Sequence, residues 1–179
     1  MPTRVGGNET GVVWKAGQII RVVIPMDNVY FEQKKQKAHE IYTAQRTIYS
    51  PYFKTEVVLN SDGFHHLQFS ARRERSKEEQ VLKFTLLPLG LRIIQQATTL
   101  QEYRKLLSPV GHTSHNGQVM KTVEWWGFVA IFTKQDIKVR VVLRRAGNGN
   151  ITFWSVMPYN KLGNSERRQK LFTAGIEDD

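Results

Sequence analysis

The chain has 179 residues, 40% of them hydrophobic, which is enough for one domain with a well-formed core and too dispersed for a membrane-spanning helix. Cysteine is absent, which excludes disulfides, thiolate metal ligands and cysteine nucleophiles. Lysine and arginine number 26 against 16 acidic residues, a net charge of +10, so a polyanion such as nucleic acid is the leading partner that we expect.

The composition indicates a single domain in three parts. Residues 1–50 are expected to form an N-terminal extension with strands and a helix, residues 51–160 the core, and residues 161–179 a tail with a basic beginning and an acidic end. The first residues lack the apolar segment of a secretory signal, so we expect a cytoplasmic protein that does not contact a membrane.

The first third of the chain is expected to alternate strand and helix. Residues 12–24 read as two short strands around Gly17, and residues 28–48 as a charge-rich helix with a thin apolar stripe. Residues 55–59 read as a strand, followed by a turn at residues 60–63. Residues 64–70 are then predicted to return as the next strand.

Helices are predicted through the middle of the chain. Ser76 and Glu79 form a capping-box pattern, so a helix should begin there and be interrupted by Pro88 and Gly90. Residues 91–94 would form another short helix. A second capping pattern predicts a helix over residues 99–107, followed by a polar loop over residues 108–117.

The sequence predicts strands over residues 119–158. Residues 119–132 have strong β character, and residues 138–158 read as a basic hairpin. A four-residue loop at 146–149 would place Arg140 opposite Ser155, with Val142 opposite Phe153 and Arg144 opposite Ile151. The opposite face would then be buried, and it would carry Val139, Val141, Leu143, Thr152, Trp154 and Val156.

These elements together predict an α+β fold in which a mainly helical N-terminal half packs on a C-terminal antiparallel sheet.

Two adjacent histidines are the first candidates for chemistry. In a strand, His66 would point with the polar side and His65 with the apolar side. An imidazole titrates near neutral pH, so it could remove a proton from a ribose 2′-hydroxyl or return one to a leaving 5′-oxygen. The alternative is a pair of structural or surface histidines without a catalytic role.

Cations follow the histidines closely. Arg72, Arg73 and Arg75 come before the predicted helix, and Lys83 lies on it. A guanidinium presents several fixed donors to phosphate oxygens and stays charged, so these residues could hold a scissile phosphate. The alternative is a solvated helix start with internal ion pairs.

The hairpin could supply the rest of a phosphate clamp. Arg140 would bind the phosphate and Ser155 would donate to it, while Tyr159 could stack on a base. Lys138 and Arg144 are further candidates for substrate contact. The alternative is an ordinary solvent-facing cross-strand pair.

Familiar cofactor and metal motifs are missing. The chain has no phosphate-binding Gly-rich loop, no dinucleotide fingerprint and no His-Glu-x-x-His motif, and carboxylate clusters for two metals are not apparent. We therefore expect no cofactor and no metal, so that RNA cleavage would have to use the ribose hydroxyl.

Residues 57–159 resemble the barnase, EndoU, colicin and RelE-like nuclease superfamily, most closely its phage and mobile-element branch. The likeness rests on Phe64-His65-His66-Leu67, a charged helix, the strand of residues 138–144, Gly147-Asn148-Gly149 and the segment Phe153-Trp154-Ser155-Val156-Met157-Pro158. The resemblance implies a metal-independent endoribonuclease that leaves a cyclic phosphate, and many members are toxins. It assigns catalysis to His66, Arg140 and Ser155, with Lys83 or a preceding arginine as the helix cation.

The chain departs from that superfamily in its doubled histidine, in a serine where threonine is frequent, and in the lack of an evident glutamate base. The leading hypothesis is an enzyme that cleaves RNA, with DNA a weaker candidate. The alternatives are a non-catalytic nucleic-acid-binding module of a mobile element, and a protein whose basic face meets an acidic antitoxin or immunity protein.

Overall fold

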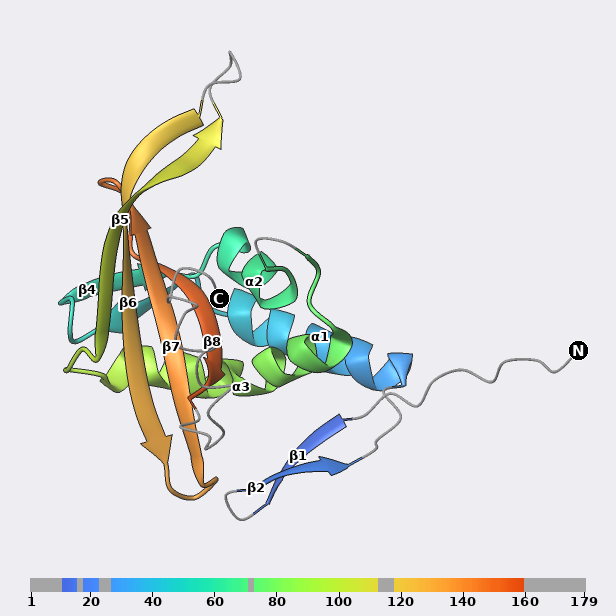
Figure 1. Cartoon of the computed structure of the whole chain (residues 1–179). Helices are drawn as coiled ribbons and strands as arrows, with labels where there is room; N and C mark the ends of the chain where they lie inside the picture. Colours follow the sequence, from blue (N-terminus) through green and yellow to red (C-terminus); the bar gives the residue numbers. More distant parts are fainter. Residues whose placement is uncertain (1–10, 16–17, 23–26, 71–72, 113–117, 160–179) are drawn as a thin grey trace, which may run out of the picture.

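The computed structural model describes residues 11–15, 18–22, 27–70, 73–112 and 118–159 (Figure 1). Three helices and eight strands make up this part of the chain. Their bounds are β1 Gly11–Lys15, β2 Gln18–Val22, α1 Asn28–Thr43, β3 Thr47–Ser50, β4 Thr55–Val58, α2 Ser61–Gln68, α3 Lys77–Gln96, β5 Glu102–His112, β6 Gln118–Phe132, β7 Ile137–Ala146 and β8 Thr152–Pro158.

The main sheet has six strands in the order β3-β4-β8-β7-β6-β5. The α+β class is confirmed, but the sheet is mixed, because β4 and β8 run parallel through a single residue pair, Val58 with Thr152. The other neighbours are antiparallel. Strands β1 and β2 form a separate antiparallel pair, as the sequence predicts.

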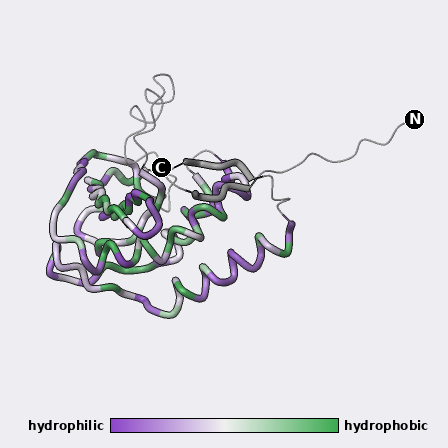
Figure 2. The backbone as a smooth tube through the Cα atoms, turned by 90° about the horizontal axis from the view of Figure 1, so that it is seen from below, coloured by the Kyte–Doolittle hydropathy of each residue, from purple (hydrophilic) through white to green (hydrophobic). Residues whose placement is uncertain are grey.

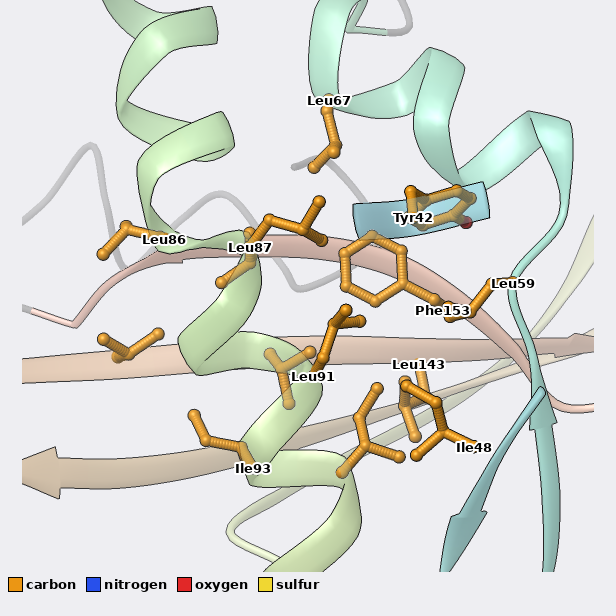
Figure 3. Packing of buried hydrophobic residues seen from close by; sticks show 14 of the residues in the cluster. Tyr42, Ile48, Leu59, Leu67, Leu86, Leu87, Leu91, Ile93, Leu143 and Phe153 are labelled. Carbon is orange, nitrogen blue, oxygen red and sulfur yellow. The ribbon is translucent and has the colours of Figure 1, made fainter. Parts of the chain in front are cut away.

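All three helices lie on one side of this sheet (Figure 1). α3 packs directly on β3, β6, β7 and β8, and α1 packs on α3. Phe153, at the centre of the interface, is fully buried between α2 and the sheet, where its ring meets Tyr42 at a centroid separation of 5.7 Å (Figure 3). Burial of aromatic and aliphatic side chains at this interface is the main stabilising contribution to the fold.

The core extends into the part of the chain that was expected to be an extension. Phe31, Ala38 and Tyr42 of α1 and Ile48 of β3 are all buried in the main cluster. The rest of α1 is mostly hydrophilic, with short hydrophobic patches between (Figure 2). α1 ends at Thr43 and not near residue 48, because Ile48 pairs with Val57 in the sheet.

The strand predicted over residues 64–70 is wrong, since residues 61–68 form α2. The Asn60 side chain accepts a hydrogen bond from the backbone N–H of Gly63 at 3.0 Å and caps the helix. The buried residues of α2 are Gly63, His66 and Leu67, a spacing of three and four that suits one helix face. The polar cluster before them begins a helix and does not close a hairpin.

The capping box at the start of α3 is confirmed, with Ser76 and Glu79 each accepting from the other's backbone N–H. The interruption at Pro88 and Gly90 is wrong, because α3 continues to Gln96. Pro88 faces solvent, while Gly90 lies so close to β8 that a Cβ there would meet Val156 at 2.9 Å. Burial of the Leu and Ile residues on both sides of the proline outweighs the loss of one helical hydrogen bond.

The helix predicted over residues 99–107 is also wrong, because residues 102–112 form β5, which pairs along β6. The polar loop is correspondingly shorter: residues 108–112 belong to β5, and residues 113–117 lie outside the described part. The expected tail of residues 161–179 lies outside it as well. Among the described residues, no helix combines the length and the apolar character needed to cross a membrane.

A polar cluster ties β5, β6 and β7 together. The Tyr103 hydroxyl donates to Glu124 at 2.6 Å, and Arg145 Nε donates to the other oxygen of that carboxylate at 3.0 Å. The Tyr103 hydrogen bond and the neighbouring Arg145 guanidinium hold the pKa of Glu124 below its ordinary value. The carboxylate therefore stabilises the folded state only while it is ionised.

We expect Glu124→Gln to lower the free energy of unfolding by about 1 kcal/mol at pH 7. Because the folded pKa lies below the unfolded value of about 4.3, this contribution is present above that pH and disappears as the pH falls through the folded pKa. Urea unfolding of both proteins at pH 7 and pH 3 checks the prediction. A stability difference between the two proteins that is equal at both pH values would contradict it.

Candidate nucleic-acid interface

The face of the sheet opposite the helices carries the basic residues of β7 that were predicted to bind substrate. Val139, Val141 and Leu143 point toward α3 and are fully buried, so the alternation of β7 places Lys138, Arg140 and Arg144 on the opposite face. We call this the outer face; α2 reaches it at Trp154, and Val123, Trp125 and Val142 on it are buried. For β7 the prediction of a cationic face backed by a hydrophobic one is confirmed, and for β8 it is not, because Phe153 and Ser155 are buried and Trp154 lies on the outer face.

The predicted register of the hairpin is wrong. Arg144 pairs with Thr152 and Leu143 with Phe153, one residue further along β8 than predicted, so Phe153 joins the main core and Trp154, which was expected in that core, lies on the outer face with Val142. A bulge between Val142 and Leu143 then shifts the remaining pairs by one more residue, so that Val156 stays in the core and Arg140 lies opposite Met157.

A stack of three side chains connects α2 with the outer face. The imidazole of His66 lies on the ring of Trp154 with a centroid separation of 4.2 Å and an interplanar angle of 25°. The guanidinium carbon of Arg144 lies 4.5 Å from the centroid of the same indole. The indole of Trp154 therefore contacts both the His66 imidazole and the Arg144 guanidinium. Its contact with Arg144 is a cation–π interaction.

The position of α2 depends on a close approach to β8. A Cβ at Gly63 would collide with the carbonyl oxygen of Phe153 and would lie 2.5 Å from the Tyr42 hydroxyl oxygen. That hydroxyl donates to the carbonyl of Asn60 at 2.9 Å and so fixes the start of α2. These contacts bring His66, one turn later, onto Trp154, where its exposed fraction is only 8%.

Four N–H groups in this region are buried without an acceptor in the part of the chain that the structure describes. They are Arg75 Nη2, Trp125 Nε1, Arg144 Nε and Trp154 Nε1. Three belong to the outer-face cluster, where Trp125 pairs with Arg144 across β6 and β7. Arg75 is linked to these three through α2, since its Nε donates to the backbone carbonyl of His66 at 3.3 Å. Buried donors of this kind are normally paired, and each costs about 1–3 kcal/mol when it is not.

Arg144 is the central cation of the outer-face cluster, which consists of Trp125, Arg144 and Trp154. Burial lowers its pKa from the ordinary value, and the carboxylate of Asp62 on α2 acts in the opposite direction. A guanidinium stays protonated despite such a shift. The result is a half-buried positive charge with strong affinity for an anion, since its own solvation is incomplete.

Arg140 does not join this cluster. Its Nη1 donates to Glu102 at 3.0 Å, and its guanidinium also contacts the Met157 sulfur. Along the strand it lies about 13 Å from Arg144. Tyr159 is near it, with the Arg140 guanidinium carbon at 5.9 Å and the Lys138 ammonium at 6.0 Å from the ring centroid. The predicted clamp of Arg140 and Ser155 is not formed.

Lys83 and Ser155 are both sealed under the sheet, so the surface roles predicted for them are contradicted. Ser155 is fully buried, and Lys83 is 5% exposed. The Lys83 Nζ donates to the Ser155 Oγ at 2.8 Å and to the Val156 carbonyl at 3.2 Å. The pair joins α3 to β8 directly behind Trp154, where it supports the strand that carries the stack.

Of the remaining predicted site residues, some lie on the surface and one is linked to the outer-face cluster. His65 is exposed and stacks on Phe69 at 4.3 Å, away from the indole that His66 contacts. Arg73 forms an exposed ion pair with Glu79 at 2.9 Å, which matches the alternative of a solvated helix start. Arg75 reaches the cluster as described. Arg72 lies outside the described residues.

Sequence reasoning missed Trp125 as a participant and gave Trp154 to the wrong face. Asp62 was seen only as part of a turn. The face of Trp154 depends on which residue of β8 pairs with Arg144, and local sequence patterns do not decide that register.

Comparisons of the chain with protein-family models, with curated proteins and with solved structures give no significant match. Within the described ranges, no three histidine, aspartate or glutamate side chains come together as ligands for a metal ion.

Proposed function

We propose that this protein binds RNA on the outer face of its sheet and cleaves it without a metal ion. The proposal rests on the four buried N–H donors of Arg75, Trp125, Arg144 and Trp154 and on the imidazole of His66. Trp154 stacks on that imidazole, Arg144 lies over Trp154 and opposite Trp125, and Arg75 donates to the His66 backbone carbonyl. A phosphodiester offers two negatively charged oxygens with several lone pairs, so it matches donors that lack an acceptor in the described residues.

Nucleic acid is the polyanion that fits best. The net charge of +10 attracts a phosphate backbone from a distance and releases its counterions on binding. Aromatic rings on a sheet face commonly stack on unpaired bases of single-stranded RNA. Tyr159 is the residue on the outer face best placed for this role. It is half-buried beside Lys138 and Arg140, and Arg140 is four residues along β7 from Arg144, where we place the phosphate.

The chemistry follows from an imidazole next to fixed cations. The ribose 2′-oxygen forms a bond to phosphorus, and the bond from phosphorus to the 5′-oxygen breaks, which leaves a cyclic phosphate. The 2′-hydroxyl proton leaves to a base, and the 5′-oxygen receives a proton from an acid. We assign one of these transfers to His66, and we assign stabilisation of the phosphorane charge to Arg144 and Arg75. An enzyme of this kind would be toxic to a cell that holds its RNA unprotected.

The test is incubation of the protein with end-labelled single-stranded RNA in excess EDTA. We expect cleavage fragments that end in a cyclic phosphate, and no cleavage of the same strand with 2′-deoxyribose. His66→Ala should reduce the rate by about a hundredfold or more, whereas His65→Ala, the matched control, should leave it nearly unchanged. RNA that stays intact, or fragments that form equally fast with His66→Ala, would remove the catalytic proposal.

A second candidate is a non-catalytic nucleic-acid-binding protein. It is favoured by the low exposure of His66, at 8%, and by the complete burial of Ser155, because both leave little room for a reacting nucleotide. In that case RNA would bind without being cut, the logarithm of the affinity would fall steeply and linearly with the logarithm of the salt concentration, and His66→Ala would leave the salt slope unchanged.

A further inference from the structure

The strand β5 ends the main sheet on one side. Its outward backbone N–H and C=O groups have no neighbouring strand among the described residues. β5 has 11 residues, whereas β3, at the other edge, has four. A long open edge is a template for pairing with another chain. The features that blunt edges, Pro109 and a register shift after it, lie toward the far end of β5, so the regular part of the edge is residues 102–108.

Apolar side chains accompany this edge. Tyr103, Leu106 and Leu107 are 51%, 41% and 66% exposed. The pairing of β7 with β6 ends at Ala146, opposite Val123. Beyond that point β5 and β6 continue together and form a projecting two-stranded arm (Figure 1). A two-stranded ribbon alone is only marginally stable in water, so a third strand would stabilise this arm.

The charge along the edge is positive. The two carboxylates beside it are already paired, Glu102 with Arg140 and Glu124 with Arg145. Lys105 and Lys121 are exposed on the same two strands. The edge therefore combines a row of backbone hydrogen-bonding groups, exposed leucines and a surplus of positive charge, since Glu124, opposite Lys105, is already bound by Arg145.

We propose that β5 accepts an extended acidic peptide segment of another protein as a seventh strand. Backbone hydrogen bonds to the edge would supply affinity, while apolar residues opposite Leu106 and Leu107 and an acidic residue opposite Lys105 would supply specificity. A second copy of this chain fits less well, because both copies carry a charge of +10 and antiparallel pairing of two β5 strands gathers their lysines. The proposal does not depend on the function proposed above.

The probe is a fluorescent acidic peptide of about eight residues, with two valines to face Leu106 and Leu107 and two glutamates to face Arg104 and Lys105. We expect saturable binding by anisotropy, and amide protection from hydrogen exchange over residues 103–109 when the peptide is bound. Lys105→Glu should weaken binding about tenfold, and Lys37→Glu, an exposed lysine on α1 with the same charge change, should weaken it much less.

A second peptide separates strand addition from charge attraction. It has the same sequence with alternate backbone nitrogens methylated, so that its charge is unchanged and its edge hydrogen bonds are lost. Failure of this peptide to bind is the expected result. Equal binding of the two peptides, equal weakening by Lys105→Glu and Lys37→Glu, or a dimer of the protein that protects residues 103–109 without peptide would each overturn the proposal.

Discussion

Replacing Gly63 by alanine should lower the free energy of unfolding by about 2 kcal/mol. The added methyl group would collide with the Phe153 carbonyl oxygen and crowd the Tyr42 hydroxyl, a contact that costs about 3 kcal/mol because the backbone of β8 cannot yield. Alanine is favoured over glycine in a helix by about 1 kcal/mol, which offsets part of that cost. Urea unfolding followed by circular dichroism measures the difference.

Ser61→Ala is the matched control, because it alters an exposed position of the same helix and should change stability by less than about 0.5 kcal/mol. The sign of the Gly63→Ala effect is decisive. If α2 did not approach β8 closely, helix propensity alone would make the variant more stable than the wild type. A stabilised variant would therefore show that α2 is not held against Phe153, and the placement of His66 on Trp154 would fall with it.

Loss of the Arg144 guanidinium should reduce RNA cleavage by about a hundredfold or more, since one fixed donor on a developing phosphate charge supplies about 3 kcal/mol. Arg144→Lys should recover only part of the rate, because an ammonium keeps the charge and loses the planar set of donors. Rates with labelled RNA in EDTA, measured at saturating protein, test this expectation directly.

A comparison of Arg140→Ala with Arg144→Ala tests which of the two arginines binds the phosphate. The sequence predicted Arg140, and the structure favours Arg144. Arg140 is engaged by Glu102 and Met157, so its loss should reduce the rate far less than the loss of Arg144. Circular dichroism spectra must match for both variants, since Arg140 also holds β5 to β7. A larger loss for Arg140→Ala than for Arg144→Ala would restore Arg140 as the phosphate ligand and contradict the assignment of the cluster.

Local patterns predicted the elements whose stability is local. The capping box at Ser76 and Glu79 marks the start of α3 because both hydrogen bonds lie within one turn of the helix. The alternation of Val139, Val141 and Leu143 with basic residues predicted the two faces of β7, since side chains alternate along any strand. Neither inference needs knowledge of a neighbouring element.

The errors occur where a distant part of the chain decides the conformation. Pro88 does not end α3, because the leucines around it are buried against the sheet. Residues 64–68 are helical because Asn60 caps α2 and is itself held by the hydroxyl of Tyr42, 18 residues earlier. Residues 102–107 fit a helix by local signals and become β5 because β6 offers a complete row of backbone partners. Tertiary contacts outweigh local propensity in each case.

By itself, the sequence determined the basic character of the protein, the absence of cysteine chemistry, and a cationic strand face backed by a hydrophobic one, because these depend on composition and on the two-residue period of a strand. Only the tertiary structure decided which cation meets the imidazole. Pairing of Arg144 with Thr152, one residue further along β8 than predicted, turns Trp154 outward, so that His66 meets Arg144 and not Arg140. The register of a hairpin and the position of its bulge depend on how two strands pack on a common core, and no period within one strand encodes them.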